Sequence, residues 1–325
     1  MSDRTFITGA TGFLGAYVAA RLGGNPLCLV RGDNPQERLD KALAPLGASA
    51  EAVPGDLSSG SLEVDVSDVT AIIHCAADVA FDRPLAEARA INVEGARLMI
   101  ELAQRAPRLE RYVHVSTAYV SGTTEGRFCE DQLDVGQDFR NSYEQSKYEA
   151  EELVRASGLP FCVVRPSIVV GEAASGWTSS FNVLYPPLQA MSRGLVKRVP
   201  ANPEALVDVV PVDHVADVVV AALAADAPDT LHAVAGDDVL TAAELAELAA
   251  GLLDQPAPVL DPDDSDLPAG GLEVYAPYFT VKTRFDATRT RALGLAAPPL
   301  REYLPRVLAF ANEARWGKRT LSRAA

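Results

Sequence analysis

The sequence of 325 residues lacks several features that mark whole classes of protein. It has only 4 cysteines, and Cys28, Cys75, Cys129 and Cys162 are scattered without a Cys-x-x-Cys pair. We therefore expect neither a structural disulfide nor a metal site. No apolar run approaches the roughly 20 residues that cross a bilayer, and the N-terminus lacks the basic and apolar regions of a signal peptide. These absences predict a cytoplasmic protein without a membrane span.

Positive charge is also scarce in this chain. The chain has 29 Lys and Arg residues and 44 Asp and Glu residues, which gives a formal net charge of −15. Such a field repels polyanions, so it argues against nucleic acid as a partner, and an anionic cofactor must be held by a local site. With 48% hydrophobic and 22% charged residues, the composition is that of a globular protein with a full core.

The first half of the chain alternates short apolar runs with amphipathic stretches. This pattern is typical of βαβ units and predicts an α/β fold built on a doubly wound parallel sheet. The expected strands are Thr5–Thr8, Leu27–Arg31, Glu51–Pro54, Ala71–His74, Arg111–Ser116 and Phe161–Pro166. The expected crossover helices are 13–22, 35–44, 84–106 and 142–157.

The pattern loosens after Gly171 and returns near residue 213. Later elements are expected as helices at 213–225, 241–253 and 300–314, a strand at Leu231–Ala235 and a Pro/Asp-rich loop at 256–270. We therefore predict one domain of residues 1–171 and 206–236, and a smaller C-terminal cap of residues 172–205 and 237–325.

A glycine-rich segment, Thr-Gly-Ala-Thr-Gly-Phe-Leu-Gly, occupies residues 8–15 between the first strand and the first helix. Glycines there allow a tight turn and close approach of a pyrophosphate to the helix N-terminus. A ligand-free turn is the alternative, and the strand before and helix after disfavour it. The predicted cofactor-binding residues of this segment are Gly9, Thr11, Gly12, Phe13, Leu14 and Gly15.

The second strand ends in Val-Arg-Gly, with Arg31 where NAD-binding units usually place a carboxylate. A guanidinium can pair with a 2′-phosphate in a bidentate manner, which predicts NADP(H) as the cofactor. A solvated Arg31 is the alternative, and Asp33 is the nearest carboxylate that would favour NAD(H). After the third strand, Asp56 and Leu57 are expected at the adenine, although Asp56 also fits an ordinary turn.

Tyr143 and Lys147 stand four residues apart, so on a helix they share one face. A phenol titrates near pH 10, and a neighbouring ammonium stabilises its anion, which suits proton transfer to a carbonyl oxygen. Thr117 ends the strand before this helix and is expected to bind that oxygen, with Ser116 as the alternative hydroxyl. A surface pair without a role is the alternative for Tyr143 and Lys147.

The sequence resembles an extended short-chain dehydrogenase/reductase with a Rossmann sheet. The resemblance is carried by TGATGFLG (8–15), GDL (55–57), HCAA (74–77), NVEGARLMIELA (92–103), VSTAYVSG (115–122), YEQSK (143–147), RPSIVVG (165–171) and VPVDHVADVV (210–219). It implies that Thr117, Tyr143 and Lys147 are catalytic and that Tyr143 and Lys147 also contact the cofactor. It further implies that the cofactor is flanked by Ala76, Ala77, Pro166, Ser167 and Ile168. Asn92 matches a recurrent helix position and receives no direct role.

Within this superfamily the chain is most similar to the thioester-reductase and fatty-acyl-reductase branch of male-sterility type. LVRG (29–32), CAADVAFDRPL (75–85), HVSTAYVSG (114–122) and the Gly-Trp at 176–177 carry that similarity. It implies hydride transfer to an acyl thioester, presented by coenzyme A or an acyl carrier protein, or to the derived aldehyde. An apolar stripe in the cap fits an apolar substrate, or simply core packing: Trp177, Phe181, Val183, Leu184, Tyr185, Leu188 and Met191.

Several alternatives stay open at this point. The same motifs suit a small-molecule ketoreductase, a hydroxysteroid-type dehydrogenase or a nucleotide-sugar epimerase or dehydratase, and a non-enzymatic NADP(H) sensor is a further class. Two basic runs could hold the anionic arm of coenzyme A or an acidic carrier protein, or be solvated: Arg193, Lys197 and Arg198, and Arg315, Lys318, Arg319 and Arg323. A homodimer is not excluded. The carbonyl substrate and the number of hydrides transferred are not determined by the sequence.

Overall fold

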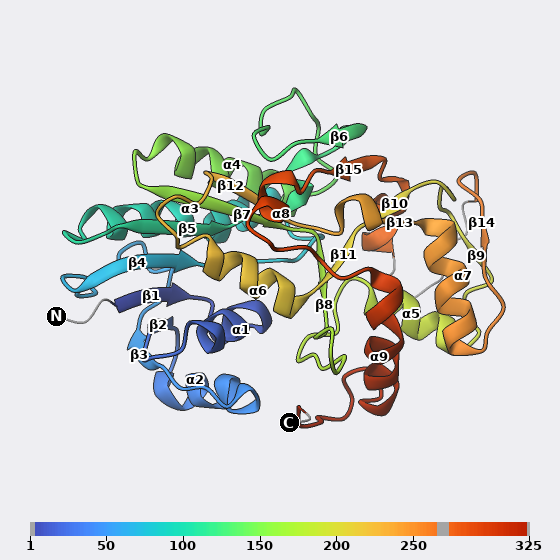
Figure 1. Cartoon of the computed structure of the whole chain (residues 1–325), viewed down its shortest axis with the longest axis horizontal. Helices are drawn as coiled ribbons and strands as arrows, with labels where there is room; N and C mark the ends of the chain where they lie inside the picture. The colour runs from blue at the N-terminus through green and yellow to red at the C-terminus, as the bar shows by residue number, and fades with distance from the viewer. Residues whose placement is uncertain (1–3, 265–272, 324–325) are drawn as a thin grey trace.

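A seven-stranded parallel sheet forms the centre of the protein, with strand order β12-β7-β5-β4-β1-β2-β3 (Figure 1). The structure is a computed structural model that describes residues 4–264 and 273–323. The strands are β1 Arg4–Thr8, β2 Leu27–Val30, β3 Glu51–Pro54, β4 Val69–His74, β5 Arg111–Val115, β7 Phe161–Pro166 and β12 Thr230–Ala233. The predicted α/β fold with a doubly wound parallel sheet is confirmed. None of the helices in the described part of the chain is long and apolar enough to cross a membrane.

Helices cover both faces of this sheet, because each connection between parallel strands must cross over it. The helices α3 Leu85–Gln104 and α4 Ser142–Ala156 pack together on one face. The other face is covered by α1 Phe13–Leu22 and α6 Val212–Ala221, with α2 Pro35–Leu43 beside α1 (Figure 1). The parallel strands end at one edge of the sheet, where the loops before α1 and α4 lie.

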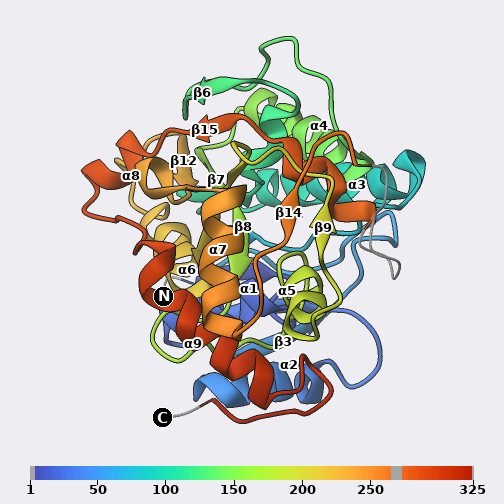
Figure 2. The same ribbon diagram turned by 90° about the vertical axis from the view of Figure 1, so that its right-hand side faces the viewer.

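The C-terminal half adds helices that gather at one side of the molecule (Figure 2). They are α5 Tyr185–Ser192, α7 Ala242–Leu253 and α9 Leu300–Glu313. Short pairs of strands join them to the rest: β8 Ile168–Val170 with β11 Val209–Pro211, β10 Leu206–Val207 with β13 Leu240–Thr241, β9 Arg198–Val199 with β14 Val259–Leu260, and β6 Gly126–Phe128 with β15 Thr283–Phe285. The remaining elements include η4 Glu273–Thr280 and α8 Thr288–Ala292. The predicted division into domain and cap remains a prediction.

The predicted elements of the sheet differ from the observed ones only at their ends. The predictions for α1, β3 and β7 coincide with the structure, and β2 ends at Val30, so Arg31 lies just outside the strand. The predicted loop 256–270 is wrong in part, because Val259–Leu260 pairs with β9. Residues 265–270 of that loop lie outside the described residues. A two-residue strand has no periodicity that a sequence pattern can reveal.

Candidate active site

The glycine loop brings the N-terminus of α1 to the end of β1. Gly9 has φ +78°, and a Cβ there would lie 2.7 Å from the backbone nitrogen of Ala76. A Cβ on Gly15 would overlap the carbonyl oxygen of Gly9. No side chain caps the first turn of α1, where Gly12 is the N-cap. The free amides of that turn suit an anion such as a pyrophosphate, so the loop fits a dinucleotide.

A hydrogen-bonded threonine holds the next loop against the glycines. The Thr8 hydroxyl is 2.7 Å from Nδ1 of His74, and it accepts a 3.1 Å hydrogen bond from the backbone nitrogen of Ala76. Burial, with a smaller effect from the Lys147 charge, lowers the pKa of His74 to about 3, so the imidazole stays neutral. Ala76 and Ala77 follow β4 and are half-buried at the same sheet edge as the glycine loop.

Two arginines lie together beyond the end of β2. Arg31 is exposed, and its carbonyl oxygen accepts a 2.8 Å hydrogen bond from Nη1 of Arg38 on α2. The sequence analysis did not include Arg38 among the cofactor-binding residues. Its position near the start of the predicted helix 35–44, shortly after Arg31, could have indicated it. Asp56 lies after β3 and accepts hydrogen bonds from the backbone nitrogen and the hydroxyl of Ser58 at 2.9 and 2.8 Å. These bonds, and more weakly the Arg31 charge, lower the pKa of Asp56. The role of Asp56 and Leu57 at the adenine remains a prediction.

The structure brings Thr117, Tyr143 and Lys147 together at the end of β5. Tyr143 and Lys147 lie one turn apart on α4, and the Tyr143 side chain lies next to Thr117, which lowers the pKa of the phenol. Nζ of Lys147 donates a 2.7 Å hydrogen bond to the carbonyl oxygen of Val115. The Thr117 hydroxyl also lies 3.4 Å from the carbonyl oxygen of Pro166, so the residues predicted beside the nicotinamide adjoin this group. Thr117, rather than Ser116, faces Tyr143.

The charge state of this group differs from the sequence expectation in one respect. Burial raises the pKa of Tyr143 to about 12, and the contact with Thr117 only partly offsets this. The pKa of Tyr143 is therefore not lowered as expected from the spacing with Lys147, because the burial of the phenol itself has the largest effect. Burial lowers the pKa of Lys147 to about 8. At neutral pH the phenol is protonated and most of the amine is charged.

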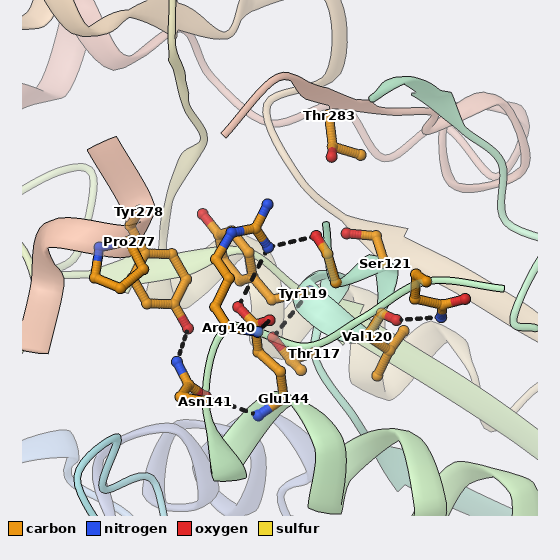
Figure 3. Close-up of polar contacts among 12 residues, drawn as sticks. Thr117, Tyr119, Val120, Ser121, Arg140, Asn141, Glu144, Pro277, Tyr278 and Thr283 are labelled. Carbon is orange, nitrogen blue, oxygen red and sulfur yellow. Dashed lines mark hydrogen bonds and ion pairs between the residues drawn. The ribbon is translucent and has the colours of Figure 1, made fainter. Parts of the chain in front are cut away.

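A polar network stabilises the first turn of α4 (Figure 3). Asn141 is the N-cap, and its side-chain oxygen accepts a 3.0 Å hydrogen bond from the backbone nitrogen of Glu144. The amide nitrogen of Asn141 donates a 3.0 Å hydrogen bond to the Tyr278 hydroxyl. Glu144 is fully buried and lies 3.5 Å from Nη1 of Arg140. The sequence reasoning missed this network, although an asparagine before a predicted helix is a common cap.

An apolar cavity of about 110 Å³ lies beside this network, among α5, α7 and η4. Four members of the predicted apolar stripe line it: Val183, Leu184, Leu188 and Met191. Ile168, which was predicted to flank the nicotinamide, lines it too. Trp177 does not, because its ring packs 6.3 Å from Phe13 and 6.0 Å from Tyr17. The stripe is therefore divided between the cavity and the core.

The two predicted basic runs are partly neutralised by carboxylates. Arg198 pairs with Asp261 at 3.0 Å and also with Asp264, while Arg323 pairs with Glu172. Both arginines are less available to an external anion than the sequence suggested. Among the described residues, no group of three or more His, Cys, Asp or Glu side chains is placed to hold a metal ion.

Comparisons with known proteins show which family and which relatives the chain resembles. The family model described as "Male sterility protein" matches residues 7–219. Human fatty acyl-CoA reductase 1 is 30% identical over 275 residues, which are 66% of this chain and 53% of that protein. A putative fatty acyl-CoA reductase of Drosophila melanogaster is 29% identical over 269 residues, 65% of this chain and 52% of that protein. The chain spans about half the length of these curated relatives.

Solved structures agree in fold. The terminal R domain from the myxalamid PKS-NRPS biosynthetic pathway matches with a TM-score of 0.83 at 25% identity, over 97% of this chain and 92% of that one. A thiolation-reductase di-domain from an archaeal non-ribosomal peptide synthetase matches with a TM-score of 0.72 at 19% identity, over 97% and 91%, which shows the fold alone. With the family model matching residues 7–219, the chain belongs to the male sterility family, within the extended short-chain dehydrogenases/reductases.

Proposed function

We propose that the chain is an NADPH-dependent reductase that transfers hydride to the carbonyl carbon of an acyl thioester, or of the aldehyde derived from it. The observation that carries the proposal is the side chain of Tyr143 next to Thr117, with Lys147 one turn away on α4, at the sheet edge that also holds the glycine loop. The apolar cavity next to this edge supports an acyl substrate. The similarity to proteins named as fatty acyl-CoA reductases supports the same chemistry.

The mechanism follows from the positions of the hydroxyl groups. The nicotinamide supplies hydride when bound. Thr117 and Tyr143 hydrogen-bond the carbonyl oxygen and stabilise its developing negative charge, and Tyr143 then transfers its proton to that oxygen. The resulting hemithioacetal expels the thiol and leaves an aldehyde, so one thioester, one NADPH and one proton yield aldehyde, thiol and NADP⁺. A phenol that keeps its proton at neutral pH suits this direction.

The substrate class is tested by a panel assay. Purified protein is mixed with NADPH and with acyl-CoA thioesters, aldehydes or ketones, and NADPH oxidation is followed. A nucleotide sugar is incubated with the protein in parallel and its products are analysed directly, because epimerisation and dehydration consume no NADPH. We expect turnover of thioesters, with free thiol released in step with NADPH oxidised until aldehyde is reduced onward. Turnover of ketones alone, or of the nucleotide sugar alone, would replace the proposal with one of the alternatives.

The choice of NADPH rests on Arg31 and Arg38. Arg31→Ala or Arg38→Ala is expected to raise the KM for NADPH by about 10- to 100-fold, because each removes a charge-assisted hydrogen bond to the 2′-phosphate. The KM for NADH should change little. Arg21→Ala removes an exposed arginine that pairs with Asp217 at 3.1 Å and serves as the control. Equal increases in the KM for NADPH and for NADH would show that these arginines do not bind the 2′-phosphate.

Activity is expected to fall as the pH rises through about 8. Burial lowers the pKa of Lys147 to about 8, so the side chain loses its positive charge above that pH and binds the ribose less well. Tyr143 and Cys75, each with a pKa raised to about 12 by burial, keep their protons in this range. The profile of kcat/KM from about pH 6 to about pH 10 checks this, with circular dichroism to confirm folding. If kcat/KM did not fall at high pH, the charge of Lys147 would have no role in the activity.

A further inference from the structure

The apolar cavity reaches the catalytic helix through a chain of aromatic rings. The ring of Tyr143 lies 5.6 Å from that of Phe81, which lies 5.1 Å from that of Tyr278. Tyr278 packs edge-on against Tyr119 at 4.9 Å and 89°. Tyr275 and Tyr278 both line the cavity. The packed rings of Phe81 and Tyr278 therefore lie between Tyr143 and the cavity.

Tyr278 belongs to both the cavity and the polar network of α4. Its ring is part of the cavity wall, while its hydroxyl accepts a hydrogen bond from Asn141, the N-cap of the helix that carries Tyr143. The residue is buried, with 6% of its surface exposed. A displacement of the Tyr278 ring by a bound chain would thus be opposed by a hydrogen bond two residues from Tyr143.

The cavity is small. Its volume of about 110 Å³ is below the roughly 150 Å³ of a protein cavity that takes up benzene. By this comparison it accommodates a linear chain of about four carbon atoms. The lining contains almost no polar side chains apart from the tyrosines, so a charged or hydroxylated group would lose its hydration without gaining partners.

We propose that Tyr278 sets the length of the acyl chain that this protein reduces, selecting linear chains with about four carbons inside the cavity, and positions Tyr143 through Asn141. This inference rests on the proposed function. Tyr278 is a specificity-determining residue through its ring and a positioning residue through its hydroxyl.

The first test is a series of saturated acyl-CoA thioesters of increasing length with the wild-type protein. We expect kcat/KM to rise about fourfold per methylene until the cavity is filled, and then to fall. Tyr278→Ala should move the optimum to longer chains, because the wall of the cavity is removed. Leu188→Ala enlarges the same cavity from α5 and should produce the same shift if the Tyr278 variant does not fold.

The second test separates the ring from the hydroxyl. Tyr278→Phe should keep the chain-length optimum and lower kcat about fivefold, with the KM for NADPH unchanged, since one hydrogen bond is lost. Asn141→Ser keeps an N-cap side chain but removes the donor to Tyr278, so it should lower kcat similarly. The double variant should lose little more than either single variant, because both remove one interaction. Tyr148→Phe is the matched control, since its hydroxyl lies on the same helix and donates a 3.3 Å hydrogen bond to Glu152, away from the Asn141 cap.

Four outcomes would overturn the inference. A wild-type optimum at long chains would show that the cavity does not limit the substrate. An unchanged kcat in Tyr278→Phe would remove the positioning role, and equal changes in kcat and in the KM for NADPH would indicate a general structural role. If the wild-type protein reduces no thioester of any length, the proposed function fails and this inference fails with it. Reduction of thioesters with the wrong length preference refutes the inference alone.

Discussion

Tyr143→Phe is expected to lower kcat by about 10²- to 10⁴-fold while NADPH binding survives. The substitution removes the hydroxyl that donates the proton and keeps the ring that packs against Phe81 at 5.6 Å. Steady-state kinetics on a substrate identified by the panel assay measure kcat, and fluorescence titration with NADPH measures cofactor binding. Near wild-type turnover in a folded variant that binds NADPH would refute the mechanism while leaving the fold intact.

The partners of Tyr143 should respond in different ways, which sharpens this prediction. Lys147→Met is expected to reduce NADPH affinity and, with it, kcat, because the ammonium binds the ribose and so positions the nicotinamide for hydride transfer. Thr117→Ala should lower kcat, and Thr117→Ser, which keeps the hydroxyl, should recover much of it. The double variant Tyr143→Phe with Thr117→Ala should lose less than the product of the single losses, because the two hydroxyls act on one oxygen. Multiplicative losses would show that they act independently.

Glu151→Ala is expected to destabilise the fold by about 3–5 kcal/mol. Glu151 on α4 and Arg165 on β7 are both fully buried, and the guanidinium makes hydrogen bonds of 3.0 and 2.6 Å to the two carboxylate oxygens. Arg155 pairs with the same carboxylate at 2.8 Å. Removing the carboxylate leaves the Arg165 charge buried without its counter-ion, which costs far more than the loss of a surface pair.

The free energy of unfolding, from urea denaturation, measures this loss. Glu149→Ala is the matched control on the same helix, because Glu149 pairs with the exposed Arg89. A surface ion pair of this kind contributes about 0–1 kcal/mol. If the two variants were equally stable, the buried pair would not be what anchors α4 to the sheet.

The elements that carry the local part of the site were predictable from the sequence. The glycine loop, the strand before it and α1 after it are encoded within a few neighbouring residues, and the spacing of Tyr143 and Lys147 follows from helix geometry alone. The predicted membership in the extended short-chain dehydrogenases/reductases is confirmed, because these local motifs recur in the family model that matches residues 7–219. The individual roles of the site residues remain predictions.

Other parts of the site depend on contacts between residues far apart in the chain. Tyr278 meets Asn141 across 137 residues, and no periodicity links an aromatic in a short 3₁₀ helix to the cap of an earlier helix. The sequence also did not reveal that Trp177 packs against α1 or that Arg198 pairs with Asp261. Trp177 was therefore included in the apolar stripe, and Arg198 was included in a basic run that could hold an anion.

The sequence by itself determined the α/β class, the order of strands and helices, the turn that suits a dinucleotide, and the Tyr143 and Lys147 pair, because each is encoded by local pattern and spacing. Only the tertiary structure decided the protonation of that pair, since burial raises the pKa of Tyr143 and lowers that of Lys147. It also decided the size of the apolar cavity and its link, through Tyr278 and Asn141, to α4. Burial and cavity volume are properties of side chains from many segments packed together, and a linear pattern does not specify how those segments meet.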